Sequence, residues 1–169
     1  MKCFGNGDYS DILRQVDIVA EHMRDPRTGL YYHGYDASRE AFWCDRETGL
    51  SQNFWLRAIG WFSVALADLC EIMPQEATGR IREIFSDLMR DILPYADTET
   101  GMYYQLVNLA GVDGNYLETS GSSMVAYAML KGARLGILDA SFAKQGRKTF
   151  DGIVRTNLSF TEGNLNLDH

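Results

Sequence analysis

Long apolar segments are missing from this sequence. No run approaches the roughly 18 residues that cross a bilayer, which excludes a membrane-spanning helix. The N-terminus, Met1-Lys-Cys-Phe-Gly-Asn-Gly-Asp8, has no apolar stretch of a signal peptide. The three cysteines (Cys3, Cys44 and Cys70) are an odd set without Cys-x-x-Cys spacing, which argues against a disulfide framework and a zinc site. We therefore expect free thiols, no metal and a cytoplasmic location.

Positive charge is also scarce. The chain has 16 Lys and Arg against 23 Asp and Glu, a formal net charge of -7. A nucleic-acid binder or a protein of anionic membrane surfaces needs a clustered basic face, so neither partner is expected. An anionic small ligand remains compatible, because one well-placed arginine can hold it. Familiar catalytic motifs are absent too: the sequence contains no Gly-x-Ser-x-Gly, no His-Glu-x-x-His and no phosphate-binding loop.

What is present is helical periodicity. The 169 residues, 46% hydrophobic and 23% charged, suit a single soluble α-domain over residues 1–169. Three segments have one apolar face, and two are apolar or small on nearly every side. The amphipathic segments are 10–24, 77–93 and 139–157; the others are 54–73 and 119–135. Half-buried and fully buried helices therefore alternate, as a ring of helical hairpins requires.

An internal repeat supports this arrangement. Asp25-Pro-Arg-Thr-Gly-Leu-Tyr-Tyr-His33 matches Asp97-Thr-Glu-Thr-Gly-Met-Tyr-Tyr-Gln105, and Asp45-Arg-Glu-Thr-Gly-Leu50 is a partial third copy. The spacing of Asp and Gly predicts a turn with an Asx hydrogen bond and a glycine at positive φ, and Tyr-Tyr predicts a short strand. Each full copy follows an amphipathic helix, so both should lie on one rim of the ring, where function is often found.

The chain is short for such a ring. A toroid of six hairpins needs more than twice this length, so the periodicity predicts an arc of about half a toroid, cut at both ends. The final segment, residues 158–169, resembles the start of another rim loop. An arc would expose apolar surface of its inner helices, which predicts that the chain either self-associates or has low stability. A separate small α-domain that happens to repeat is the alternative.

The densest group of candidate site residues is Asn53-Phe-Trp-Leu-Arg-Ala-Ile-Gly-Trp61. Asn53 is placed to cap the helix, and Arg57 and Trp61 are neighbours on one face. A buried arginine needs an acid or an anionic ligand, and its planar fork suits a carboxylate. With the flat faces of Trp55 and Trp61 for a sugar ring, these residues predict a pocket for a uronic acid. Alternatively, Arg57 pairs with Asp68 or Asp36 and the tryptophans fill the core.

Four further polar positions lie on the predicted rim. His33 and its repeat equivalent Gln105 can both hydrogen-bond a sugar hydroxyl. Asp36 can act as a base, as a hydroxyl acceptor or as the partner of Arg57. Glu118 is either a dipole partner at a helix N-terminus or a site acid. The surrounding segment, residues 115–123, is rich in small residues that would allow two inner helices to approach closely.

Together these motifs resemble glycoside hydrolase family 105, the unsaturated rhamnogalacturonyl hydrolases. The resemblance is carried by Thr28-Gly-Leu-Tyr-Tyr-His-Gly-Tyr-Asp36, Thr48-Gly-Leu-Ser51, Phe54-Trp-Leu-Arg-Ala-Ile-Gly-Trp61 and Gly114-Asn-Tyr-Leu-Glu-Thr-Ser-Gly-Ser122. It covers essentially the whole chain. Family 88, the unsaturated glucuronyl hydrolases, shares a shorter Trp-x-Arg pattern, and the His-Gly-Tyr-Asp36 loop favours family 105.

The resemblance implies an (α/α)6 toroid that removes Δ4,5-unsaturated galacturonic acid from pectin-derived oligosaccharides. An Asp protonates the double bond at C4 and activates the water that adds at C5, after which the hemiketal opens and the glycosidic bond breaks. No metal or cofactor is implied. His33, Trp55, Arg57 and Trp61 match substrate-contact positions. The catalytic Asp of the family would lie before Met1, and its C-terminal Arg-Asp-Gly-Ser segment has no match here.

Two other functions are compatible with the residues. The chain could be a truncated homologue that keeps a uronate-binding wall without chemistry. It could also belong to another toroid class, such as a sugar epimerase, but that chemistry calls for a pair of histidines in the pocket. The sequence contains only His22, His33 and His169, and His22 falls on an amphipathic surface segment.

Overall fold

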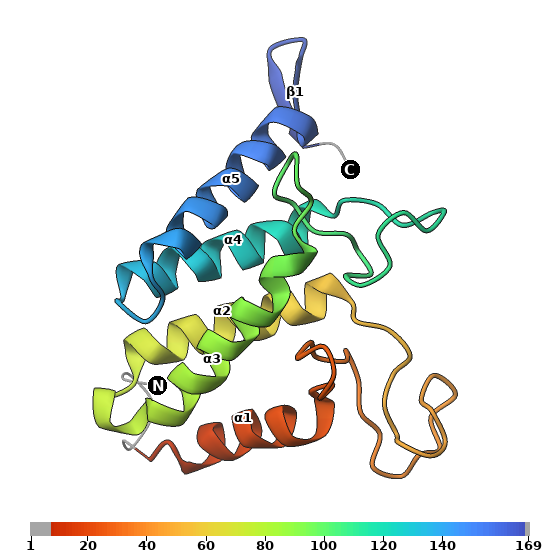
Figure 1. Cartoon of the computed structure of the whole chain (residues 1–169), viewed down its shortest axis with the longest axis vertical. Coiled ribbons are helices and arrows are strands. Elements are labelled where there is room, and N and C mark those ends of the chain that lie inside the picture. The colour runs from red at the N-terminus through yellow and green to blue at the C-terminus, as the bar shows by residue number, and fades with distance from the viewer. Residues whose placement is uncertain (1–7, 168–169) are drawn as a thin grey trace.

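The computed structural model describes residues 8–167, which form five α-helices and a small hairpin (Figure 1). The α-helices are α1 (Ser10–Met23), α2 (Leu56–Ile72), α3 (Gly79–Ile92), α4 (Thr119–Arg134) and α5 (Ala140–Asn157). Two 3-10 turns, Gln75–Ala77 and Leu93–Tyr95, flank α3. Each α-helix agrees within two residues with a segment predicted from periodicity. Cys3 and His169 lie outside the described residues.

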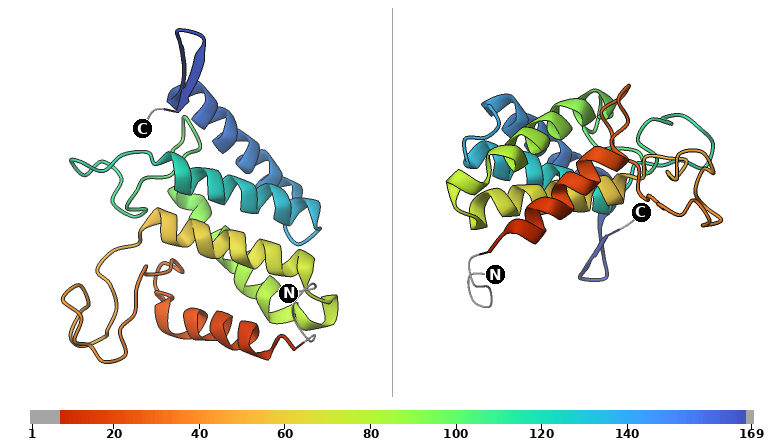
Figure 2. Two further views of the ribbon diagram at one scale, coloured as in Figure 1. Left: turned by 180° about the vertical axis from the view of Figure 1, so that it is seen from behind. Right: turned by 90° about the horizontal axis from the view of Figure 1, so that it is seen from below.

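The helices form two layers. α2 and α4 lie side by side and run in the same direction, while α1, α3 and α5 lie on the outside (Figures 1 and 2). The long loops after α1 and α3 emerge at one end of this arrangement, where α2 and α4 begin (Figure 1). Both copies of the repeat are therefore on one rim, as predicted. No helix of the described residues has the length and apolar character needed to cross a bilayer.

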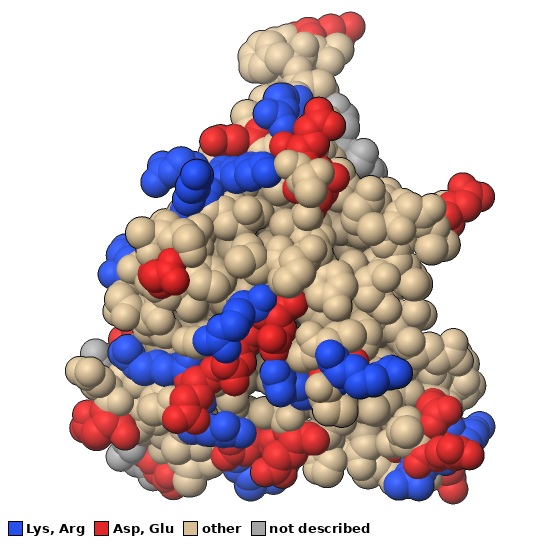
Figure 3. Space-filling model, viewed as in Figure 1, with Lys and Arg blue, Asp and Glu red and all other residues tan. Residues whose placement is uncertain are grey.

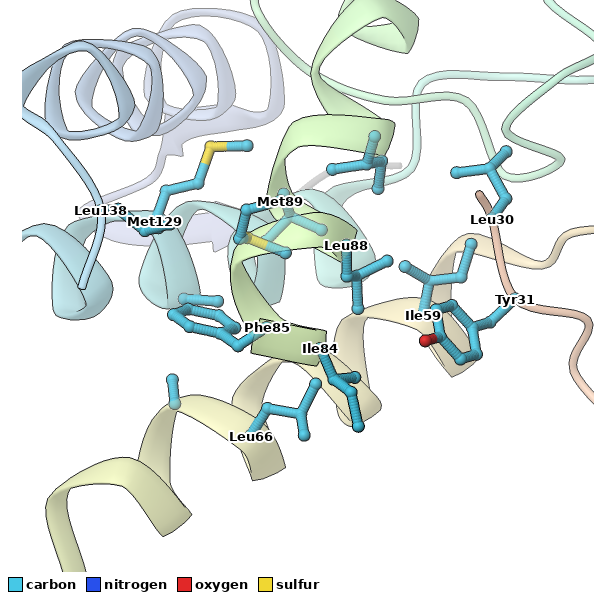
Figure 4. Packing of buried hydrophobic residues seen from close by; sticks show 14 of the residues in the cluster. Leu30, Tyr31, Ile59, Leu66, Ile84, Phe85, Leu88, Met89, Met129 and Leu138 are labelled. Atoms are coloured by element: carbon cyan, nitrogen blue, oxygen red, sulfur yellow. The ribbon is translucent and has the colours of Figure 1, made fainter. Parts of the chain in front are cut away.

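The core lies between α3 and the two inner helices. The buried face of α3 contains Ile81, Ile84, Phe85, Leu88, Met89 and Ile92 at helical spacing. These side chains meet Leu66 of α2 and Met129 of α4 (Figure 4). All of them are nearly inaccessible to solvent, so the 3.6-residue period of the sequence corresponds to burial.

Helix α2 is less enclosed than predicted. Trp61 and Ile72 are 61% and 44% exposed, whereas Leu56, Ile59 and Leu66 are fully buried. The physical reason is that α3 and α4 pack closely on two sides of α2, whereas the face that bears Trp61 only borders a groove shared with Val19 and Met23 of α1. The prediction that residues 54–73 are buried nearly all round is thus wrong for that face, although an arc of a ring has such a face at each end.

Glycines set the close approach of α2 and α4. A Cβ built on Gly60 would lie 2.9 Å from the Cβ of Met124, and one built on Gly121 would lie 2.5 Å from the Cγ of Leu56. Neither position can hold a side chain without moving a helix. The small residues around Gly121 therefore have the packing role considered above.

The three repeated loops share one hydrogen-bond pattern. A carboxylate oxygen of Asp25, Asp45 and Asp97 accepts from the backbone N–H and the hydroxyl of the Thr three residues later. The Gly that follows has a φ of 73–78° and donates to the carbonyl of the same Asp. The Asx turn and the positive φ are confirmed. The predicted strands are wrong: only isolated bridges form there, such as Arg24 with Tyr31 and Tyr104 with Leu117.

The C-terminal segment is a hairpin rather than a rim loop. Strands β1 (Leu158–Thr161) and β2 (Asn164–Leu167) pair antiparallel, with Leu158 opposite Leu167. Gly163 takes a φ of 81° in the turn between them, a conformation that favours glycine. The hairpin projects from the end of α5 (Figure 1) and leaves Phe160 exposed.

Candidate functional site

The site is built where the first rim loop enters α2. Trp55 is the residue before the helix, and its extended backbone pairs with Leu106 of the second rim loop. Leu56 N–H donates to the carbonyl of Gln105 at 2.8 Å, and Val107 N–H donates to that of Phe54 at 3.1 Å. These bonds hold the two loops together at the start of α2. The predicted helix cap by the side chain of Asn53 is wrong, because the cap position is occupied by Trp55.

Arg57 lies at the centre of this site. Its guanidinium carbon is 5.1 Å from the ring centroid of Trp55, which places a cation against an aromatic face. Its Nη2 is 3.5 Å from Oε1 of Glu118, at the limit of a hydrogen bond. The Nε of Arg57 is buried and has no partner among the described residues. The side chain remains 41% exposed, so the guanidinium can still reach an anion in solution.

Glu118 belongs to α4 and is 4% exposed. Its Oε2 accepts from the N–H of Gly121 at 2.6 Å, and its Oε1 accepts from the hydroxyl of Ser120. These bonds make Glu118 the N-cap of α4, where a negative charge is favoured by the helix dipole. Both carboxylate oxygens of Glu118 therefore accept hydrogen bonds from the first turn of α4. The 3.5 Å contact neutralises the charge of Arg57 only weakly.

The partners considered for Arg57 in the sequence are wrong. Asp68, farther along α2, accepts from the ammonium of Lys131 at 2.7 Å and from the hydroxyl of Tyr127 at 2.8 Å. Lys131 also pairs with Glu71 at 2.6 Å. Burial alone would lower the pKa of Lys131, but its hydrogen bonds to these carboxylates raise that pKa overall. This network joins α2 to α4 and does not include Arg57.

His33 and Trp61 are the other two predicted contact residues, and they share a groove that Trp55 and Arg57 do not line. The His33 ring meets the Trp55 ring edge to face, with centroids 6.0 Å apart, and its Nδ1 is 3.1 Å from the carbonyl oxygen of Asn53. Trp61 is one helical turn beyond Arg57 on α2. His33 and Trp61 both line a groove of about 320 Å³, which also includes Met23 and Phe62. We refer to His33, Trp55, Arg57 and Trp61 as the rim wall.

Asp36 is held by its own loop and does not face Arg57. Its carboxylate accepts from the backbone N–H groups of Ser38, Glu40 and Ala41, at 2.8–3.0 Å, and from the Ser38 hydroxyl. These bonds, above all that from Ala41, lower the pKa of Asp36 from 3.8 to about 2. The predictions that Asp36 pairs with Arg57 or serves as a free base are not supported, because its lone pairs stabilise residues 36–41.

This carboxylate gives the chain a testable acid sensitivity. Because the folded pKa of Asp36 is depressed, its stabilising effect is complete above the ordinary value of 3.8 and is lost as the pH falls towards 2. We expect the urea midpoint of the unmodified chain to fall more between pH 4 and pH 2 than that of Asp36→Asn, which cannot titrate there. Equal slopes in the two proteins would contradict this assignment.

Ser120 is a contributor that sequence patterns did not identify. Its hydroxyl and the Gly121 N–H together fix the Glu118 carboxylate. The signal was available in Glu118-Thr-Ser-Gly121, an acid followed by small residues at the start of a helix. Among residues 8–167, no three His, Cys, Asp or Glu side chains are close enough together to hold a metal ion.

Comparison with known proteins places this geometry in a family. The family model described as Glycosyl Hydrolase Family 88 matches residues 1–169. Protein Atu3128 of Agrobacterium fabrum is 39% identical over 157 residues, which are 90% of this chain and 66% of that protein. The unsaturated rhamnogalacturonyl hydrolase YesR of Bacillus subtilis is 27% identical over 135 residues, which are 75% of this chain and 34% of YesR.

Solved structures agree on the fold. A Clostridium acetobutylicum ATCC 824 glycoside hydrolase described as family 105 superposes with a TM-score of 0.94 at 38% identity. The superposition covers 98% of this chain and 47% of that protein, so the chain spans about half its length. These relatives have an (α/α)6 toroid, and the five helices described here follow its alternation of outer and inner helices. The chain belongs to Glycosyl Hydrolase Family 88, and its structural neighbours include glycoside hydrolases described as family 105.

Proposed function

We propose that the rim wall binds the terminal unsaturated uronic acid of pectin-derived oligosaccharides, in a glycoside hydrolase that removes Δ4,5-unsaturated galacturonic acid. The observation that carries the proposal is the state of Arg57. Its guanidinium has one long contact to Glu118, its Nε has no partner within residues 8–167, and it is open to solvent. A carboxylate ligand would accept hydrogen bonds from the exposed part of the guanidinium.

The geometry suits a sugar acid better than a free inorganic anion. Two parallel hydrogen bonds from Arg57 can hold a planar carboxylate. The indoles of Trp55 and Trp61 present flat apolar surface for a pyranose ring, and His33 can donate to or accept from a hydroxyl. The relative YesR, an unsaturated rhamnogalacturonyl hydrolase by name, supports the same substrate class.

The chemistry proposed is hydration of the double bond. A carboxylic acid protonates C4, and water adds at C5 with loss of its proton to the resulting carboxylate. The hemiketal that forms opens and releases the rest of the oligosaccharide. Neither Asp36 nor Glu118 is free for this task, because one is bound in its loop and the other caps α4. The proposal therefore assigns substrate binding to the rim wall. It assigns proton transfer to a carboxylate other than Asp36 and Glu118.

The engagement of Asp36 and Glu118 in local hydrogen bonds favours one alternative, a uronate-binding protein without chemistry. The two possibilities separate in one experiment. An unsaturated rhamnogalacturonan disaccharide is titrated into the chain by calorimetry, and the ultraviolet absorbance of its double bond is followed at high protein concentration. Binding with a fall in absorbance supports the hydrolase, and binding without one supports the alternative. If the disaccharide does not bind, both are wrong. The saturated disaccharide is the control for non-specific absorbance change.

A further inference from the structure

A second charged feature lies on α5, away from the rim wall. Lys144, Lys148, Asp151 and Arg155 line a groove of about 650 Å³, whose opposite side includes Glu99 of the second rim loop. Arg147 stands beside them. We call this feature the α5 groove. Figure 3 shows the blue side chains of Lys and Arg gathered along the side of the molecule where α5 lies in Figure 1.

The sequence places these residues in a row. Positions 144, 148, 151 and 155 are separated by four, three and four residues, so they share one side of the helix. At 1.5 Å per residue the row is roughly 16 Å long. The opposite side of α5 is occupied by packing, since Gly146, Thr149 and Ile153 are buried there. The row is therefore held on a rigid, outward-facing surface.

The cations of the α5 groove form no close ion pairs among the described residues, although the charge of Lys148 acts on Asp97. Within residues 8–167, neither the lysines nor the arginines of the α5 groove form an ion pair. Lys148 donates to the carbonyl of Thr98 at 2.7 Å, and Arg155 donates to that of Glu99 at 3.4 Å. On the outer helix α3, by contrast, Arg90 pairs with Asp87 at 2.7 Å. The α5 groove thus carries four cations against Asp151 and Glu99, an excess of positive charge on a chain of net charge -7.

We propose that the α5 groove is a second carbohydrate site, which binds a stretch of acidic polysaccharide with a carboxylate on each sugar, such as polygalacturonate. A row of separated cations suits a linear polyanion better than a single small anion, which would need several donors converging on one point. The choice of a uronate polymer rests on the proposed function. Bound there, a polymer would be retained on the same molecule as the rim wall.

The carboxylates in the groove favour a sugar over a nucleic acid. Asp151 and Glu99 point acceptors into a surface that would repel phosphates. A polysaccharide also carries hydroxyl groups, which can donate to these acceptors while its carboxylates meet the lysines and arginines. Cations and acceptors in one groove therefore match the mixed donors and anions of a uronate chain.

The test uses a saturated oligogalacturonate, which has no double bond and so is not the ligand proposed for the rim wall. Titration calorimetry compares the unmodified chain with Lys144→Glu/Arg147→Glu. Both residues are exposed, so the variant should fold, and circular dichroism checks this. We expect affinity to fall at least about tenfold in the variant and to weaken with added salt in the unmodified chain. The neutral variant Lys144→Gln/Arg147→Gln should lose affinity to a smaller extent.

Two controls separate this site from the rim wall and from total charge. Arg14→Glu/Arg90→Glu changes the net charge by the same amount on α1 and α3 and should bind oligogalacturonate normally. Arg57→Ala should also bind it normally, even though it removes the arginine proposed to hold the unsaturated end. The proposal is overturned if the unmodified chain does not bind, if the α1/α3 variant loses as much affinity, or if Arg57→Ala abolishes binding while the α5 variant retains it.

Discussion

Replacing Arg57 with alanine is expected to weaken binding of the unsaturated disaccharide roughly 30- to 900-fold, which corresponds to about 2 to 4 kcal/mol. The reason is that Arg57 is the cation of the rim wall and its hydrogen-bonding capacity is largely unused in the free chain. The fold should be little affected, since Glu118 keeps its bonds to Ser120 and Gly121 when Arg57 is removed. Calorimetry with the purified variant measures the effect.

Two comparisons make this prediction specific. Arg57→Lys keeps the charge but not the planar fork, so it should bind more tightly than Arg57→Ala and more weakly than the unmodified chain. A disaccharide whose carboxylate is esterified should bind the unmodified chain and Arg57→Ala equally weakly. Arg90→Ala, an exposed arginine on α3, is the matched control and should have no effect. Tight binding by Arg57→Ala would show that the carboxylate is held elsewhere.

The sequence predicted that the candidate site residues lie on one rim. It did not predict that Arg57 contacts Glu118. The repeat placed His33 and the start of α2 on one rim, because it follows each amphipathic helix and precedes an inner one. The ion pair between Arg57 and Glu118 joins residues 61 positions apart. It depends on how closely α2 approaches α4, which is set by Gly60 and Gly121. A single sequence gives helix faces and caps, but not the distance between two helices.

Predictions based on local sequence preferences failed at Asn53 and succeeded at the Asx turns. Asn53 is a good capping residue, yet the rim loops pair through Trp55 and Leu106, which delays the helix until after Trp55. The competing tertiary hydrogen bonds therefore overrode a local preference. The Asx turns at Asp25, Asp45 and Asp97 were correct, because all their bonds lie within five residues and need no distant partner.

The packing of α3 against the inner helices leads to the largest expected effect on stability. We expect Phe85→Ala to lower the free energy of unfolding by about 3 to 5 kcal/mol. Phe85 is fully buried, and its ring fills the space over Gly132 of α4, where an added Cβ would lie 2.7 Å from Cε1 of Phe85. Leu66 of α2 and Leu138 border the same space (Figure 4). Urea denaturation measures this loss of free energy of unfolding, provided that its dependence on urea concentration is the same in both proteins.

Phe150→Ala on α5 is the matched control for this prediction, because it removes the same side chain from a site that is 57% exposed. It should cost less than about 1 kcal/mol, since most of that ring is already in contact with water. A domain of this size has about 5 to 15 kcal/mol of stability, so Phe85→Ala should remove a large fraction of it. Equal losses in the two variants would mean that the buried contacts of Phe85 stabilise the chain no more than those of an exposed ring.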